Sequence, residues 1–251
     1  MNIAAMILLL GAAWPLWNAW HATAATTLRH ALVWAAAAWA AWLLALATRA
    51  DVATYLALSL SGCAGVAILG ARRPGVGAWN FVVAGLLAVF LLPVAQGWGT
   101  PRVETAQQIF LGATLAIPVL NYLPTRLGLA GSLCGLGCAA ELARLSGLHI
   151  AAGQDAAYLC LAAAPWLGLL ARRRGGSHSA FERVWRDYRD RFGFMWGQRA
   201  REQFNRAAEN AGWAVRLTWG GLERTGKGAV PCEEELLRTL FAVLKRFTVV
   251  S

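Results

Sequence analysis

The feature that most constrains this chain is the part of it that almost lacks charge. Residues 1–171 contain seven arginines, four acidic residues and no lysine, whereas residues 172–251 contain 16 lysines and arginines and nine acidic residues. Charged residues make up only 14% of the whole chain, against about 25% in an average soluble domain. We therefore expect a membrane region over residues 1–171, followed by a polar, basic tail.

The apolar region divides into seven segments, each long enough to cross a bilayer as a helix. About 20 apolar residues suffice for one crossing, and a helix satisfies its backbone polar groups within its own segment. Glycine, proline and charge separate the segments, as in ARRPGVG and QGWGTPRVE. The sequence predicts an all-α integral membrane protein with seven transmembrane helices, at about residues 3–20, 29–48, 52–70, 78–96, 106–123, 127–145 and 155–171.

The arginines predict how these helices are oriented. With the tail in the cytoplasm, the connections on that side carry arginines without nearby acids: Arg29, Arg72, Arg73, Arg126 and Arg172 to Arg174. The arginines on the other side lie near acids, as Arg49 does to Asp51. Because arginine excess marks the cytoplasmic side, we expect an outer N-terminus and a cytoplasmic C-terminus, in a bacterial inner membrane. HATA (21–24) resembles a signal-peptidase site, but no basic residue precedes its apolar run, so we expect residues 3–20 to be retained.

No motif of enzymatic or metal chemistry is found in the sequence. The five cysteines form no Cys-x2-Cys pair, and GxSxG, HExxH and Walker patterns are absent. Only His21 and His30 could meet, at the ends of neighbouring spans, where a structural role is the more common one. We therefore expect neither catalysis nor a metal or cofactor.

A few polar residues within the predicted spans are candidates for a functional site. Glu141 is the one acid in the apolar zone, where an ionisable group is costly to bury, although Arg144 follows three residues later. The other candidates for polar or hinge roles are amides and prolines: Asn18, Asn121, Gln107, Gln108, Pro15 and Pro118.

Small residues in two spans predict close helix packing. GSLCGLGC (131–138) and SLSGCAG (59–65) place glycine, serine and cysteine together, and small residues let membrane helices approach closely. We favour packing over thiol chemistry at the candidate positions, which are Gly62, Gly131, Cys134, Gly135 and Cys138.

The tail predicts amphipathic helices at about 179–211 and 231–247, with a hairpin or loop between them. The first helix is expected to bend near RFGFMWG (191–197). Its basic and aromatic residues fit an anionic lipid surface, with Arg172, Arg173, Arg174, Arg183, Trp185 and Arg186 as candidates. The same pattern fits a helix packed within a small domain. Acidic residues among the arginines argue against nucleic acid.

Two parts of the membrane region resemble parts that lie about 100 residues later. LGAAWPLWNAW (10–20) and LGATLAIPVLNYLP (111–124) share Leu-Gly-Ala, a proline, and an asparagine three residues after it. DVATYLALSLSGCAGVAILGARRPG (51–75) and DAAYLCLAAAPWLGLLARRRGG (155–176) share Asp, Tyr-Leu and Ala-Arg-Arg in order. The pattern indicates two parallel three-helix units joined by the fourth helix.

Such a 3+1+3 arrangement resembles the SWEET and PQ-loop transporters of sugars and amino acids. Those proteins have prolines in the first helix of each unit, where Pro15 and Pro118 fall, but the Pro-Gln dipeptide of the PQ-loop group is absent. The resemblance covers residues 1–171 and implies a small-solute transporter with a site at the membrane midplane.

The function that we favour from the sequence is a non-catalytic scaffold or accessory subunit of a membrane complex. Its partners would be the bilayer, anionic lipid at the cytoplasmic face, and other proteins or a second copy of the chain. The two hypotheses differ at Asn18 and Asn121. A transporter predicts that both face a wet central cavity, and a scaffold predicts that both are packed or lie at the lipid interface.

Overall fold

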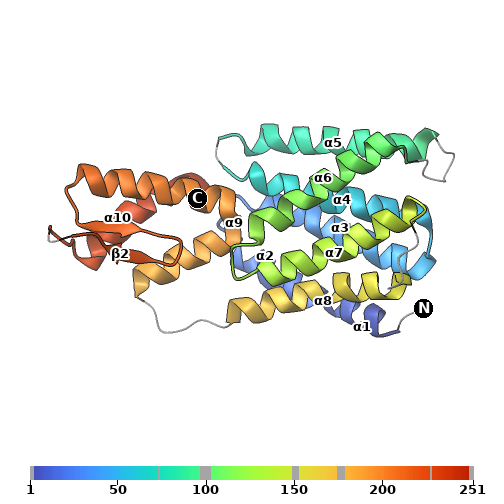
Figure 1. The fold of residues 1–251 in the computed structure, drawn as a ribbon, viewed down its shortest axis with the longest axis horizontal. Helices are drawn as coiled ribbons and strands as arrows, with labels where there is room; N and C mark the ends of the chain where they lie inside the picture. Colours follow the sequence, from blue (N-terminus) through green and yellow to red (C-terminus); the bar gives the residue numbers. More distant parts are fainter. Residues whose placement is uncertain are drawn as a thin grey trace.

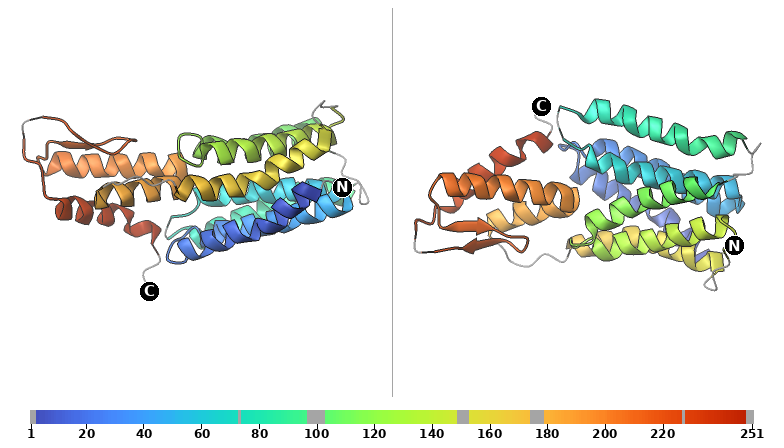
Figure 2. Two further views of the ribbon diagram at one scale, coloured as in Figure 1. Left: turned by 90° about the horizontal axis from the view of Figure 1, so that it is seen from below. Right: turned by 45° about the horizontal axis from the view of Figure 1, so that its top comes forward.

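The computed structural model describes residues 3–72, 74–96, 103–148, 153–173, 179–226 and 228–248. The structure is mostly helical, with 79% of the described residues in helices. It forms an elongated molecule in which a helical bundle carries a smaller C-terminal domain at one end (Figure 1). We call this end of the bundle the domain end and the opposite end, where the N-terminus lies, the far end (Figure 2).

Eight helices make up the described bundle. The predicted first span is divided at Ala12 into α1 and α2, and Pro15 is accommodated in the first turn of α2, where an absent N–H leaves no helical bond unmade. The other helices run close to the predicted ranges. The bounds are α1 Ile3–Gly11, α2 Ala13–Ala22, α3 Arg29–Thr48, α4 Asp51–Leu69, α5 Val76–Gln96, α6 Thr105–Tyr122, α7 Gly128–Leu145 and α8 Gly153–Arg173.

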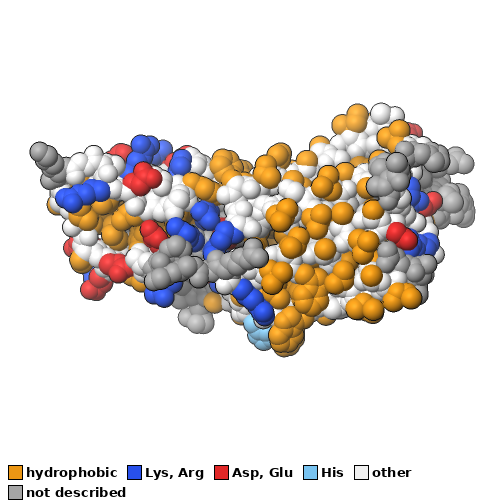
Figure 3. All heavy atoms as spheres, turned by 60° about the horizontal axis from the view of Figure 1, so that its bottom comes forward, with side chains coloured by type: hydrophobic (Ala, Val, Ile, Leu, Met, Phe, Trp, Pro, Cys, Tyr) orange, Lys and Arg blue, Asp and Glu red, His pale blue; other side chains and the backbone are white. Residues whose placement is uncertain are grey.

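Four stretches in the described residues are long and apolar enough to cross a membrane: Ile3–Ala22, Arg29–Thr48, Asp51–Leu69 and Val76–Gln96. The bundle surface is apolar, with large side chains such as Ile7, Trp17, Phe81 and Ile109 more than half exposed. Figure 3 shows hydrophobic side chains covering the bundle, while charged side chains gather on the C-terminal domain and at the far end. A soluble monomer rarely exposes so large an apolar surface. The fold is therefore consistent with the predicted membrane location, whereas crossings by α6, α7 and α8 stay a prediction.

The bundle helices form a closed ring. Going around it, α3 packs on α4, α4 on α6, α6 on α7, and α7 on α8. The ring closes where α8 packs on α1 and α2, which also contact α3. α5 lies outside the ring and packs on α4, at the edge of the molecule in Figure 1 and in the right view of Figure 2. We call α1 to α4 the first half of the ring, with α1 and α2 counted as one span, and α6 to α8 the second half. The contacts of α3 with α1, α2 and α4 in the first half correspond to those of α7 with α6 and α8 in the second.

Small residues allow these helices to approach one another. A Cβ atom added to Gly65 would lie 2.7 Å from Cδ of Pro118, and one added to Gly135 would lie 2.4 Å from Cγ2 of Val119. At Gly62 the nearest atom would be Cγ2 of Thr114, at 3.1 Å. Larger residues at these positions would push α4, α6 and α7 apart.

The C-terminal domain consists of α9 (Ala180–Asn210), the antiparallel strands β1 (Val215–Leu217) and β2 (Leu222–Arg224), α10 (Glu233–Leu244) and the short 3-10 helix η1 (Lys245–Phe247). The hydroxyl of Ser179 accepts a hydrogen bond from the Glu182 amide and so caps α9. Three glutamates in the first turn of α10 suit the positive end of its dipole. The two helices and the hairpin bury one apolar core, whose central members include Phe181, Trp185, Phe204, Leu217 and Leu240.

Candidate functional site

A side chain of the bundle completes a kink in the C-terminal domain. The one residue of α9 with non-helical angles is Gly193, at φ 75° and ψ −165°, a conformation that suits glycine. The Asn121 amide group donates to the carbonyl of Phe192 at 3.3 Å and accepts from the N–H of Met195 at 3.0 Å. It therefore satisfies the backbone groups on both sides of the kink. Asn121 is only 6% exposed, so it is packed against α9 and does not face a wet cavity.

The residues that follow Asn121 bind the same domain. The Tyr122 hydroxyl donates to the carbonyl of Arg191 at 2.8 Å, and the carbonyl of Pro124 accepts from Trp219 Nε1 at 2.6 Å. Arg126 forms an ion pair with the buried carboxylate of Asp190. The end of α6 and the turn after it thus hold α9 and the hairpin through hydrogen bonds and one buried ion pair.

Two other parts of the bundle at the domain end bind the domain as well. In the turn between α2 and α3, the Thr27 backbone N–H donates to the carbonyl of Phe247 at 3.1 Å, and the Thr27 hydroxyl donates to the carbonyl of Ala71 at 2.7 Å. At the end of α4, the carbonyl of Ile68 accepts from Trp196 Nε1 at 3.2 Å. Three separate parts of the bundle therefore fix the position of the C-terminal domain.

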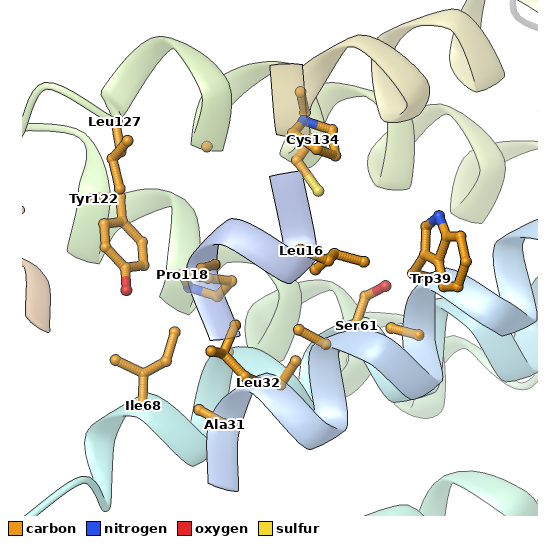
Figure 4. A pocket seen from close by; sticks show the side chains of 18 of the residues that line it. Leu16, Ala31, Leu32, Trp39, Ser61, Ile68, Pro118, Tyr122, Leu127 and Cys134 are labelled. Atoms are coloured by element: carbon orange, nitrogen blue, oxygen red, sulfur yellow. The ribbon is translucent and has the colours of Figure 1, made fainter. Parts of the chain in front are cut away.

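The ring encloses a cavity of about 420 Å³ that reaches the domain end. Side chains from α1, α2, α3, α4, α6, α7 and α8 line it, and most are apolar. In Figure 4, Leu16, Ser61, Pro118 and Cys134 come from four different helices and point toward a common space. The cavity body offers few polar groups, so it does not resemble a site for a small polar solute.

Charged residues surround the cavity only at the domain end, where Arg172, Asp190 and Arg191 line it. Arg191 pairs with Asp187 at 2.6 Å and donates to the carbonyl of Ala22 at 2.6 Å. Asp190 accepts from Arg189 at 2.9 Å, besides its pair with Arg126. Among the described residues, we find no hydrogen bond or ion pair for Arg172, although it lies near enough to Asp187, Asp190 and Arg191 for electrostatic interaction.

Two reciprocal ion pairs connect the halves of the ring at the far end. Arg49 Nη2 lies 2.8 Å from Asp155 Oδ1, and Arg144 Nη1 lies 2.8 Å from Asp51 Oδ1. Arg49 follows the last residue of α3, and Arg144 lies in the last turn of α7. Their partners lie in the first turns of α8 and α4, respectively. Glu141 is 1% exposed and accepts from Arg144 Nε at 2.9 Å. The buried acid is therefore compensated within an ion-pair network.

The remaining polar candidates do not meet in the interior. Asn18 is half-buried and donates to the carbonyl of Trp14 in its own helix, at 2.9 Å. Gln107 forms a capping box with Glu104, and Gln108 donates to the carbonyl of Val103. Both glutamine side chains thus form hydrogen bonds with backbone groups just before α6. Pro15 is buried in α2, and Pro118 packs on Gly65 beside the cavity.

Of the residues expected at a helix contact, Gly131, Cys134 and Gly135 line the cavity together with Cys138. Cys138 is buried and Cys134 is half-buried. A Cβ on Gly131 would lie 3.5 Å from Cβ of Tyr122, so α7 is close to α6 along this face. The two cysteines thus lie on a face of α7 whose small residues allow close contact with α6 and also border the cavity.

The structure places Trp185 away from the lipid surface that the sequence suggested for it. Its side chain is fully buried in the domain core, 6.4 Å from the Tyr188 ring and 6.3 Å from the Trp219 ring. Burial also raises the pKa of Tyr188 well above its ordinary value, which keeps this phenol neutral. Arg186 donates to the carbonyl of Gly220 at 3.1 Å. Arg173 and Arg183 are exposed, and Arg174 lies outside the described residues.

Sequence reasoning missed the partners of Asn121 and the exchange of ion pairs at the far end. The sequence did hold a signal for the ion pairs, because Arg49 precedes Asp51 in the first half and Arg144 precedes Asp155 in the second. Nothing in it indicated that each arginine pairs with the aspartate of the other half. No group of three or more potential metal ligands occurs in the part of the chain that the structure describes.

The chain matches no protein-family model, and comparisons with curated proteins and with solved structures find no match.

Proposed function

We propose that this protein is a seven-span protein of a bacterial inner membrane that holds its C-terminal domain at the cytoplasmic face as a non-catalytic scaffold or accessory subunit. The observation that carries the proposal is the attachment of the domain. Three parts of the bundle bond to it directly, namely the turn between α2 and α3, the end of α4 and the end of α6, where Asn121 bonds to the backbone on both sides of the kink in α9. A domain held in this way presents its outer surface in one fixed orientation to a partner.

The orientation follows from which arginines lie beside the domain. Arg72 stacks over Trp196 at 5.9 Å, and Arg126 pairs with Asp190. Both belong to the arginines that have no acidic residue nearby in the sequence, and an excess of such arginines predicts the cytoplasmic side. At the far end, Arg49 and Arg144 instead have an acid nearby in the sequence, Asp51 and Glu141 respectively. This division supports a cytoplasmic C-terminus.

The two asparagines favour the scaffold over a carrier of small polar solutes. Asn121 is packed against α9, and Asn18 bonds to its own helix. Neither supplies a polar site at the centre of the bundle, and the lining of the central cavity is mainly apolar.

Purification from native membrane in a mild detergent, with cross-linking and mass spectrometry, tests the scaffold. We expect a stoichiometric partner with the wild-type chain, and loss of most of it with Asn121→Ala, which loosens the domain. Asn18→Ala is the matched control and should keep the partner, because Asn18 contacts only its own helix. A lone monomer stabilised by a solute would contradict the proposal.

A second candidate is the 3+1+3 transporter, and the reciprocal ion pairs favour it. When two units are related by a two-fold axis, each contact between them occurs twice, with the partners exchanged between the units. Arg49–Asp155 and Arg144–Asp51 are two such contacts. Rocking of the two units would break both pairs together. Solute uptake by reconstituted vesicles that falls when Asp51→Asn and Asp155→Asn are combined would support this function over the scaffold.

A further inference from the structure

The central cavity has the size and chemistry of a ligand site. Its volume of about 420 Å³ lies within the range of about 300–1,000 Å³ that small-molecule sites occupy. Leu16, Leu32 and Trp39 contribute apolar walls, and Ser61 is one of the few polar groups in its body. Side chains that face empty space lose dispersion contacts, so an apolar occupant would stabilise the folded bundle. An apolar chain fits this lining, whereas a sugar or an amino acid would leave its polar groups without partners.

The domain end of the cavity carries positive charge. Arg126, Arg172, Arg189 and Arg191 lie around Asp187 and Asp190, so four guanidinium groups face two carboxylates. The carboxylates are already bound by Arg126, Arg189 and Arg191. Arg172 lines the cavity and, within the described ranges, has neither an ion pair nor a hydrogen bond. It is the cation that remains available to an anionic group in the cavity.

We propose that the cavity binds an anionic amphiphile with a single long apolar chain. The chain occupies the space between the ring helices, and a phosphate-bearing head group lies at the domain end against Arg172. A guanidinium group presents paired donors that match phosphate oxygens, and burial beside apolar walls strengthens this interaction relative to water. The site goes beyond the proposed scaffold, which requires no ligand.

The geometry also links the ligand to the domain. Asp190 and Arg191, which line the end of the cavity, belong to α9. The same residues bind Arg126 and the carbonyl of Ala22 in the bundle. A head group at this point therefore contacts the junction of bundle and domain, so ligand binding should stabilise both parts together.

Binding is tested with the purified full chain in a non-ionic detergent. The probe is lysophosphatidylglycerol, which has one acyl chain and an anionic phosphodiester. Lysophosphatidylcholine with the same chain tests the net charge, a fatty acid tests a carboxylate head, and inorganic phosphate tests an anion without a chain. We expect lysophosphatidylglycerol to raise the thermal unfolding temperature and to bind with one-to-one stoichiometry in native mass spectrometry, with weaker effects from the other three. Equal stabilisation by lysophosphatidylcholine or by inorganic phosphate would overturn the proposal.

Variants locate the site. Arg172→Gln should weaken binding of lysophosphatidylglycerol by about tenfold or more, since it removes a charge-assisted hydrogen bond. Arg173→Gln is the matched control, because Arg173 is exposed, is the next residue on α8 and does not line the cavity. Ala35→Leu adds volume to the cavity wall and should also weaken binding, while Val33→Leu on the exposed side of α3 should not. Unchanged affinity in Arg172→Gln or in a folded Ala35→Leu would exclude this cavity as the binding site.

Discussion

The Asn121 side chain and Gly193 form a matched pair: the glycine permits the kink in α9, and the asparagine amide bonds to the backbone on both sides of it. Their contact is close, because a Cβ on Gly193 would lie 2.1 Å from Asn121 Nδ2. The pair joins α6 of the ring to the C-terminal domain.

Replacing Asn121 with alanine should lower the free energy of unfolding. The substitution leaves the buried carbonyl of Phe192 without its partner, at a cost of about 1–3 kcal/mol, and removes the acceptor of the partly buried Met195 N–H, which costs less. Denaturation in detergent, followed by tryptophan fluorescence, measures the loss. Asn18→Ala should change stability by less than about 1 kcal/mol, since its one hydrogen bond lies within its own helix. Equal stability of the two variants would show that the kink does not depend on Asn121.

Gly193→Ala should destabilise the chain more than Gly212→Ala. Both glycines have positive φ, at 75° and 68°, so both substitutions carry a backbone strain of about 1–3 kcal/mol. An added Cβ meets nothing within 4 Å at Gly212, but would collide with Asn121 at Gly193. The difference between the variants, measured as a difference in thermal unfolding temperature, reports the collision together with the stricter backbone requirement at Gly193, whose ψ of −165° suits only glycine. A smaller effect at Gly193 would contradict the contact.

The reciprocal ion pairs should not respond equally to loss of their arginines. Arg49→Gln removes a pair in which Asp155 is 58% exposed, and such pairs contribute about 0.2–1 kcal/mol. Arg144→Gln leaves Glu141 buried without its cation, which costs about 3–5 kcal/mol. Unfolding measurements should therefore rank Arg144→Gln as the more harmful change.

Neutralising the buried acid provides the control for that prediction. Combining Glu141→Gln with Arg144→Gln should recover part of the stability that Arg144→Gln loses, because no buried charge remains. Failure to recover any of it would assign the loss to packing of the arginine side chain.

Cysteine labelling should determine the proposed orientation. Cys232 is exposed in the C-terminal domain, and Leu148, which is also exposed, follows α7 at the far end. In a chain whose other cysteines are alanine, a membrane-impermeant maleimide should label Cys232 only in inverted vesicles. Leu148→Cys, made in the same chain with Cys232→Ala, should be labelled only from the outside of intact cells. Labelling of both from one side would contradict the topology.

The sequence predicts local features of this fold well and distant contacts poorly. Apolar runs and the breaks that follow them, at Arg49 and at Gly70, set where α3 and α4 end, and RFGFMWG indicates the bend that the structure places at Gly193. The partner of that bend lies more than 70 residues earlier in the chain, and no local pattern encodes such a pairing. Trp185 shows the same limit. Its helix carries the basic and aromatic residues of a lipid-binding surface, but Leu217 and Leu240, far downstream, complete the core that buries it.

The kink also sets an order for assembly of the chain. The two halves of α9 need only local hydrogen bonds, whereas the turn between them needs a side chain from α6. A polypeptide whose α6 failed to pack into the bundle would therefore carry a misaligned domain with unmet backbone groups beside Gly193. The finished shape of the C-terminal domain thus depends on correct packing of α6, and a cellular protease that senses exposed backbone would distinguish the two products.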